Sequence, residues 1–471
     1  MSSEFNMYRS LTFTKKKKQA DQALCEFLQE IKDADVASLQ LDEIISILVR
    51  QCSQDQVSFN RLTAIQWIQE LVTLGRERLK DLYADMLNAI LLLLADEESE
   101  IRAVARTANE NLLNLVRKTE DKLDFSFLLQ KLEDELNNKD ETTRIASLSW
   151  ISMLLSKDAS QVLSHMNKLF PLLVDKLLCD QSDNVVMMNL EVLARIACNE
   201  DQFIHVLRNV VRLFREDRSI LESRGTMIVR NLCLKLDAEK IFMNLSKILL
   251  GEKDLKFASV MIQTLNHILL TSSELLELRS LLQTSLSTKN RKAFEVFKTL
   301  YSSWCHNPVA TFSLCLLAQA YPLSSSLVGK FADVDVTLGF LTQIDRLVLL
   351  LESPIFVGLR LQLLEPESDT HAHLVKSLFG ILMLLPQSSA FKTLRDRLMS
   401  VSALYLTSSS SKKSNRLPSY VPILLDQFTE IRDKHTKARA DALKAQRLDG
   451  GDESTTINNG MTVGVSTKEG V

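Results

Sequence analysis

The scarcity of glycine and proline is the feature that most constrains how this chain of 471 residues folds. It has 12 glycines and 8 prolines; five of the glycines lie after residue 449, and the first proline is Pro171. Tight hairpins and the loops of α/β units depend on these residues, because glycine supplies positive φ and proline presets a turn. The chain is therefore expected to form long helices joined by short polar turns.

Apolar residues in the segment from Glu100 to Arg117 recur at spacings of three and four, which places them on one face of a helix. Another apolar helix is predicted from about Lys80 to Leu94, and a polar turn from Asp96 to Ser99 separates the two. The two segments together form a helical hairpin.

The hairpin recurs along the first half of the chain. Its turn aspartates, Asp55, Asp96, Asp140 and Asp183, are spaced 41, 44 and 43 residues apart (55 to 96, 96 to 140, 140 to 183). A period of about 40 to 47 residues with two helices per repeat is typical of HEAT and armadillo proteins. One hairpin cannot bury its apolar stripe alone, so neighbouring repeats must stack. The fold class is therefore predicted to be all-α, a HEAT/armadillo-like solenoid of helical hairpins that continues into a C-terminal helical domain.

The turns carry two further patterns. The aspartate of each turn can cap the second helix of its hairpin by accepting backbone N–H bonds. The arginines that follow these turns, Arg61, Arg102 and Arg144, are expected to reach a carboxylate of the next turn. We expect these contacts to form a ladder of ion pairs.

Composition shifts along the chain suggest six parts. The expected parts are an unstructured N-terminal segment (1–20), HEAT-like repeats (21–217), a C-terminal helical domain (218–406), a serine-rich linker (407–418), an amphipathic helix (419–448) and a disordered tail (449–471).

The sequence offers no catalytic, cofactor-binding or metal-binding residues, and the protein is not expected to be an enzyme. GxGxxG, GxxxxGK[ST], HExxH and GxSxG do not occur, nor does CxxC among the seven cysteines. Cys305 next to His306 is interpreted as a helix end rather than a catalytic pair, because neighbours in sequence do not face each other on a helix. His371 and His373 are interpreted as a solvent-exposed helix start rather than a metal site.

Charge and hydropathy narrow the range of partners. The net charge of −3 provides no basic field for nucleic acid. The longest apolar run, Ala89 to Ala95, is too short to cross a bilayer. Lys15 to Lys18 could touch an anionic membrane surface, although a solvated tail is the favoured interpretation. Any membrane association is expected to be peripheral and indirect.

Five stretches closely resemble one known family. They are 229–242, 253–275, 303–317, 354–366 and the segment containing LPQSSAF that ends at Phe391. The family is the vacuole-morphology HEAT scaffold of the kinase–phosphatase complex that makes and turns over phosphatidylinositol 3,5-bisphosphate. The resemblance extends from about Cys25 to Leu448, whereas the first twenty residues match nothing in the family, and its N-terminal repeats are expected to be missing.

The resemblance implies a protein without activity of its own. Its partners would be a Sac-type phosphoinositide phosphatase, a FYVE-bearing phosphatidylinositol 3-phosphate 5-kinase and further copies of itself. The C-terminal region would bind the phosphatase and self-associate. The implied location is the cytosolic face of endosome and vacuole (late endosome or lysosome) membranes, with a soluble cytoplasmic pool.

The family-like stretches contain candidate residues for partner contact or for a structural corner. These are Trp304, His306, Asn307, Pro308, Arg360, Gln362, Pro386 and Gln387. For each of them, fixing the geometry of the helices is at least as good an interpretation as partner contact. An α-solenoid transport or cargo adaptor is the alternative function.

Overall fold

The computed structural model describes residues 41–53, 55–75, 80–119, 125–286, 290–333, 336–405 and 417–449, and every regular element within them is a helix. The all-helical prediction is therefore confirmed. The chain divides into two compact units, unit 1 (Met1–Leu213) and unit 2 (Phe214–Val471). The expected N-terminal segment, linker residues 407–416 and tail residues 450–471 lie outside the described residues. The six-part division of the chain stays a prediction.

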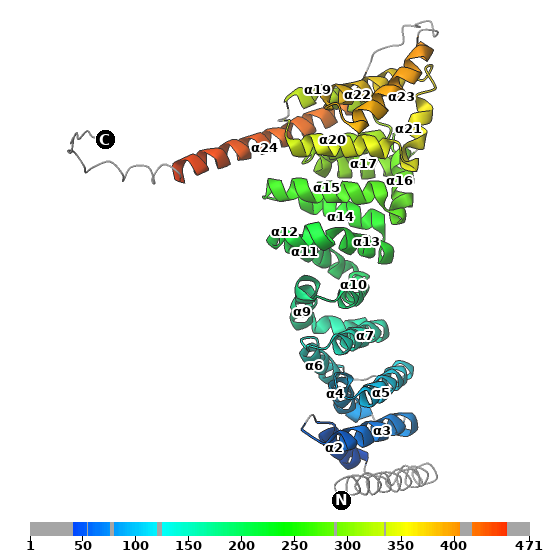
Figure 1. Cartoon of the computed structure of the whole chain (residues 1–471), viewed down its shortest axis with the longest axis vertical. Coiled ribbons are helices and arrows are strands. Elements are labelled where there is room, and N and C mark those ends of the chain that lie inside the picture. The colour runs from blue at the N-terminus through cyan, green and yellow to red at the C-terminus, as the bar shows by residue number, and fades with distance from the viewer. Residues whose placement is uncertain are drawn as a thin grey trace, which may run out of the picture. The chain divides into compact units, whose positions relative to one another are not determined.

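Unit 1 is a row of helical hairpins (Figure 1). Helix α5 pairs with α4, α7 with α6, and α10 with α9, which are the predicted hairpins. The second helices form a continuous inner row, because α3 packs on α5, α5 on α7 and α7 on α10. The helices are α2 (Leu41–Gln51), α3 (Ser58–Gly75), α4 (Tyr83–Leu94), α5 (Ser99–Lys118), α6 (Ser126–Glu135), α7 (Glu141–Lys157), α8 (Ala159–Ser164), α9 (Met166–Cys179), α10 (Asp183–Ala197) and α11 (Glu200–Glu216).

Two of the three predicted ion pairs between turns are present in unit 1. Arg61 donates from Nε to Asp96 at 2.6 Å, and Arg144 donates from Nε to Asp180 at 2.7 Å. Both carboxylates are buried, at 0% and 3% exposure. Burial alone would raise the pKa of Asp96, but hydrogen bonds from Arg61 and from the Glu98 N–H lower it overall. Each pair joins one hairpin to the next.

The prediction is wrong for Arg102. Its Nη1 donates to the carbonyls of Asp96 and Glu97 in its own turn, and it contacts no carboxylate among the described residues. The position equivalent to Asp96 and Asp180 in the next turn is Asn138, which accepts the N–H two residues later just as they do. A neutral amide replaces the carboxylate here, so the ladder of ion pairs is interrupted.

The capping prediction holds at one turn of unit 1. Asp140 is the N-cap of α7 and accepts the N–H of Thr143 at 2.9 Å. At the other turns the cap residue is different: Ser182 caps α10 in front of Asp183, and Glu98 occupies the N-cap of α5 without a side-chain bond. Asp96 is instead used for the ion pair with Arg61.

Unit 2 has a similar two-layer arrangement. Its inner row runs α13, α15, α18, α20 and α23, and the outer row contains α14, α17, α19 and α22. The elements are α12 (Arg218–Ile220), η3 (Leu221–Gly225), α13 (Thr226–Lys235), α14 (Ala238–Leu250), α15 (Leu255–Thr271), η4 (Ser273–Leu275), α16 (Leu276–Gln283), α17 (Arg291–Trp304), α18 (Pro308–Leu317), α19 (Tyr321–Lys330), η5 (Phe331–Asp333), α20 (Leu338–Leu351), η6 (Pro354–Phe356), α21 (Val357–Gln362), α22 (His371–Leu384), α23 (Ser389–Tyr405) and α24 (Tyr420–Asp449).

The last helix, α24, completes the outer row of unit 2. It packs on both α17 and α19. Its buried residues are Val421, Leu424, Phe428 and Ile431. Tyr301 of α17 donates its hydroxyl to the Leu424 carbonyl at 3.1 Å, and Gln427 donates to Ser302 at 2.9 Å. Beyond this contact, α24 extends away from the other helices of the unit (Figure 1).

Helices α19 and α22 approach each other unusually closely. A Cβ added at Gly380 of α22 would overlap Cγ1 of Val328 on α19. A side chain at position 380 would therefore force the two helices apart.

Candidate functional site

Trp304, the first predicted site residue, ends α17 inside the core of unit 2. The indole is fully buried and lies 6.3 Å from the ring of Phe242, centroid to centroid. Its Nε1–H donates to Oδ1 of Asn266 at 3.2 Å. Asn266 lies on α15, so Trp304 joins two successive hairpins.

Asn307 and Pro308 begin the next helix. Asn307 caps α18 by accepting the Ala310 N–H at 3.0 Å, and its amide donates to Gln343 of α20 at 2.9 Å. Pro308 occupies the first turn of α18, where its missing N–H costs nothing. Both residues are buried. Their contacts in the structure fix the corner between α17 and α18.

His306 links the same corner to α24. Its Nδ1 lies 3.0 Å from Nε2 of His435, with the rings edge to face. Burial lowers the pKa of both imidazoles to about 4, with help from Arg432 and, for His306, from Lys434. Both rings are therefore neutral near pH 7, and one must donate while the other accepts.

The neighbouring Cys305 faces away from this pair. Its thiol contacts the Tyr301 carbonyl at 3.1 Å, and burial raises its pKa well above the usual range. A buried neutral thiol is a poor nucleophile. The contacts agree with the interpretation of Cys305–His306 as a helix end.

Arg360 caps a neighbouring helix from within. Its Nη1 donates to the carbonyls of Leu351 and Ser353, which follow the last turn of α20. Arg279 makes the equivalent bonds to Leu269 and Ser272 at the end of α15. The same device at two helix ends indicates a structural contribution, because C-terminal carbonyls need donors.

Gln362 holds the turn between α18 and α19. It accepts the Tyr321 hydroxyl at 2.5 Å and donates to Gln319 at 3.0 Å. Gln319 has a φ of 58°, a left-handed conformation that side chains other than glycine adopt at a cost. Gln362 and Tyr321 help to keep this turn in place.

Pro386 and Gln387 differ from the other six predicted residues because both are exposed, in the turn between α22 and α23. The eight residues therefore do not form one site: 304–308 lie at the corner beside α24, Arg360 and Gln362 hold other turns, and 386–387 face solvent. Partner contact by any of them stays a prediction.

His371 and His373 have separate protein partners. His371 begins α22 as predicted, but it is buried, with Nε2 3.1 Å from the Leu363 carbonyl, so the expected exposure is wrong there. His373 contacts Ser325 at 3.0 Å. No group of three or more metal-ligating side chains occurs in the part of the chain that the structure describes.

Sequence reasoning missed an exposed apolar surface on unit 2, formed by Leu276, Val357, Leu361 and Leu364. Leu276 and Val357 line one cavity of about 470 Å³ beside α16 and α21. Leu361 and Leu364 follow Val357 at helical spacing, and each is 56% exposed. Periodicity had indicated that Leu361 and Leu364 lie on an apolar helix face, but it does not tell a buried face from an exposed one.

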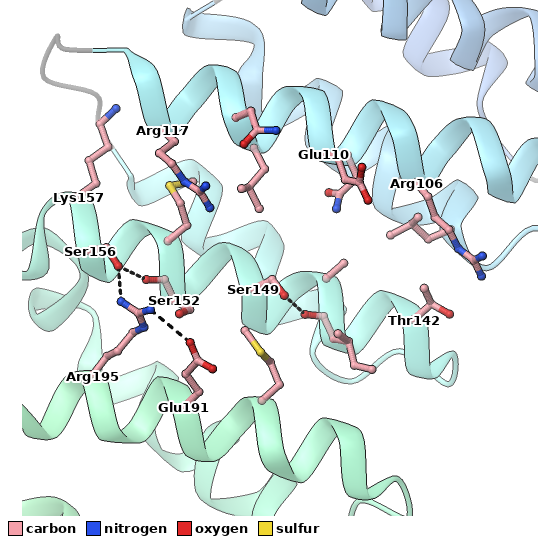
Figure 2. A pocket seen from close by; sticks show the side chains of 18 residues that line it. Arg106, Glu110, Arg117, Thr142, Ser149, Ser152, Ser156, Lys157, Glu191 and Arg195 are labelled. Carbon is pink, nitrogen blue, oxygen red and sulfur yellow. Dashed lines mark hydrogen bonds and ion pairs between the residues drawn. The ribbon is translucent and has the colours of Figure 1, made fainter. Parts of the chain in front are cut away.

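Unit 1 contains a larger groove of about 830 Å³ over α5, α7 and α10 (Figure 2). Arg195 of α10 donates to Ser156 of α7 at 2.6 Å and to Glu191 at 3.3 Å. Lys157 donates to the Val116 and Thr119 carbonyls at the end of α5. The groove therefore lies on the inner row of helices and has basic groups along it.

The chain was compared with known families and proteins. Residues 218–401 match the family described as Vacuolar protein 14 C-terminal, a region named for the binding of a partner protein. Residues 17–185 match EF3 N-terminal HEAT repeat. The HEAT prediction for the first half is thereby confirmed.

Three curated relatives are similar over most of this chain. The Protein VAC14 homolog of Arabidopsis thaliana is 48% identical over 387 residues, which are 82% of this chain and 51% of that protein. The Schizosaccharomyces pombe homolog is 34% identical, covering 88% and 52%. Vacuole morphology and inheritance protein 14 of Saccharomyces cerevisiae is 31% identical, covering 77% and 41%. The chain spans about half the length of the curated relatives it matches.

Solved structures resemble the chain weakly. The Kap95:Nup1 complex is 10% identical with a TM-score of 0.35, covering 89% of this chain and 56% of that one. Importin beta is 12% identical with a TM-score of 0.33, covering 83% and 58%. At these TM-scores the likeness carries no argument about transport. None of the described helices has the length and apolar character needed to span a bilayer.

Proposed function

The chain belongs to the VAC14 family of HEAT-repeat proteins, and from that premise we propose that it is a non-catalytic scaffold for the enzymes of phosphatidylinositol 3,5-bisphosphate metabolism. In this proposal unit 2 binds a Sac-type phosphoinositide phosphatase. One observation carries it: the match to the partner-binding C-terminal region of Vacuolar protein 14 covers residues 218–401, the segment that folds as α12 to α23.

We place the phosphatase contact on the apolar surface of unit 2 formed by Leu276, Val357, Leu361 and Leu364. A soluble monomer rarely leaves such a group of aliphatic side chains exposed without use, and burying them would stabilise a complex. The cavity of about 470 Å³ beside Leu276 and Val357 can accept a protruding side chain of a partner. The exposed turn at Pro386 and Gln387 is a second, polar candidate contact.

The proposal includes two further associations. Unit 2 also binds other copies of the chain, and the assembly holds a FYVE-bearing phosphatidylinositol 3-phosphate 5-kinase together with the phosphatase. Through these enzymes the chain associates peripherally with endosome and vacuole membranes. The family membership supports this arrangement.

Co-expression with a Sac-type phosphatase, followed by size exclusion with multi-angle light scattering, tests the proposal. We expect a co-eluting complex that contains several copies of this chain. Replacing both Leu361 and Leu364 with Asp should abolish co-elution, because two charges would be buried at the contact. Replacing the exposed Ile204 of unit 1 with Asp is the matched control and should leave the complex intact.

The same experiment separates the parts of the proposal. A chain that elutes as a monomer and never with the phosphatase would overturn the scaffold function. A complex that tolerates the Leu361 and Leu364 changes would keep the function and overturn the assigned surface.

A further inference from the structure

We propose that the groove of unit 1, between α5, α7 and α10, binds an extended acidic segment of a partner protein. The groove lies outside the match to the C-terminal region of Vacuolar protein 14, which begins at residue 218. The inference therefore does not depend on phosphatase binding by unit 2.

The charge of the groove is opposite to that of the whole chain. Four basic side chains line it, Arg106, Arg117, Lys157 and Arg195, against the two carboxylates Glu110 and Glu191. Glu191 is already paired with Arg195. The chain as a whole carries a net charge of −3, so this surface is a local basic exception that favours an acidic ligand.

Arg106 and Arg117 are free to bind such a ligand. Both are exposed on α5, about three turns apart, and neither has an ion pair within the described part of the chain. Lys157 and Arg195, by contrast, also hold protein atoms. Figure 2 shows Arg106 toward one end of the groove and Arg117, Lys157 and Arg195 toward the other. Carboxylates spaced along a segment can therefore meet a cation at each end.

Asn109 makes the floor between them a hydrogen-bond donor. The Nε1–H of Trp150 donates to its Oδ1 at 2.8 Å, and an indole nitrogen can only donate. This bond fixes which way the amide points and leaves the two N–H groups of Nδ2 for a ligand. An oriented amide with its acceptor occupied suits a main-chain carbonyl or a carboxylate.

Unit 2 repeats the device. Trp304 Nε1–H donates to Oδ1 of Asn266, which also accepts the Ser313 hydroxyl at 2.8 Å. Asn266 likewise lines a cavity over the inner helices, of about 210 Å³. In both units a tryptophan of the next hairpin aims an asparagine amide, but the larger cavity with four basic side chains is in unit 1.

The dimensions of the groove favour an extended chain over a small anion. Packed helices lie about 8–10 Å apart, so a path over three of them is about 20 Å long. An extended segment covers that path with about six residues at roughly 3.3 Å each. Leu113, Ile145 and Met153 provide apolar contacts between the charged groups. A single phosphate would contact one end.

The experiment uses the full chain and a fluorescein-labelled peptide of ten residues in which Asp and Ser alternate. Fluorescence anisotropy measures binding, with Lys or Asn in place of Asp in two comparison peptides. We expect binding of the Asp peptide alone, weakened by added salt because exposed charges are screened.

Three variants test the assignment of the groove. Replacing Arg106 and Arg117 with Glu should weaken binding by more than tenfold. Asn109→Asp keeps an acceptor for Trp150 but removes the donors, and should weaken it by about threefold or more. Replacing Lys168 and Arg208 with Glu makes the same charge change on exposed positions of unit 1 outside the groove, and should change binding by less than twofold.

Several results would overturn the proposal. These are equal binding of the Asn peptide, equal weakening by the Lys168 and Arg208 control, or no binding of the Asp peptide. Groove-dependent binding of inorganic phosphate without peptide binding would likewise replace the proposal with a small-anion site. Circular dichroism of each variant confirms that a loss of binding is not a loss of fold.

Discussion

Unit 1 and unit 2 have the same two-layer helical architecture but are held together differently. In unit 1 the buried ion pairs join residues 35 and 36 apart, and the Trp150–Asn109 bond joins residues 41 apart. Unit 2 has comparable bonds and adds contacts of α24 with residues 123 and 129 positions away. A repeat array is stabilised by contacts between neighbours, whereas an element returning from a distance couples the repeats that it touches.

The largest expected effect tests that coupling. Phe428→Ala removes a fully buried ring of α24 and should lower the free energy of unfolding of unit 2 by about 3–5 kcal/mol. Hydrogen exchange measured by mass spectrometry should show faster exchange in α17 and α19, and no change in α3 to α10. Faster exchange confined to α24 would show that the rest of unit 2 does not depend on it.

The second prediction concerns the connection between hairpins in unit 1. Arg144→Ala leaves the buried Asp180 carboxylate without its guanidinium and should cost about 3 kcal/mol. Arg218→Ala, which breaks the exposed pair with Asp254 in unit 2, should cost less than about 1 kcal/mol. Arg102→Ala, where Asn138 interrupts the ladder, is the control within unit 1. Urea unfolding should show the largest cost for Arg144→Ala, and an equal cost for Arg144 and Arg102 would contradict the role of the ladder.

A third prediction concerns the close approach of α19 and α22. Gly380→Ala should destabilise unit 2 by about 1–3 kcal/mol, because the added methyl overlaps Val328. Val328→Ala in the same chain should recover much of that loss, measured as a double-mutant cycle. If the two changes simply add, the contact with Val328 is not the cause.

The smallest expected effect is a pH dependence confined to unit 2. His306 and His435 have pKa values lowered to about 4, whereas unfolded histidine titrates near 6.5. The unfolded state then binds more protons between these values, so stability is retained above about pH 6.5 and lost as the pH falls toward 4.

The slope should reach at most about 1.4 kcal/mol per pH unit for each histidine. Denaturant unfolding of unit 2 at several pH values measures it, and His435→Phe should reduce the slope. A slope that is the same in unit 1 would assign the effect to other groups.

Residue patterns predicted local features well and distant ones poorly. The hairpins around Asp96 and Asp140 followed from helical periodicity, and the Arg61 and Arg144 pairs followed from the regular spacing of the turns. The same reasoning failed at Arg102, because replacement of the aspartate by Asn138 is recognised only once the turns are superposed in space. It also treated Arg360 and Gln362 alike with Pro386, although their neighbours give them buried partners and leave Pro386 in solvent.

By itself the sequence determined the fold class, the repeat and the family, because these depend on composition, on period and on contacts between adjacent hairpins. The tertiary structure decided the rest. Insertion of α24 beside α17 and α19, the His306–His435 contact and the exposure of Leu361 and Leu364 depend on which surfaces remain uncovered after the repeats have stacked. A helix period specifies which side chains share a face, but only the packed chain decides what covers that face.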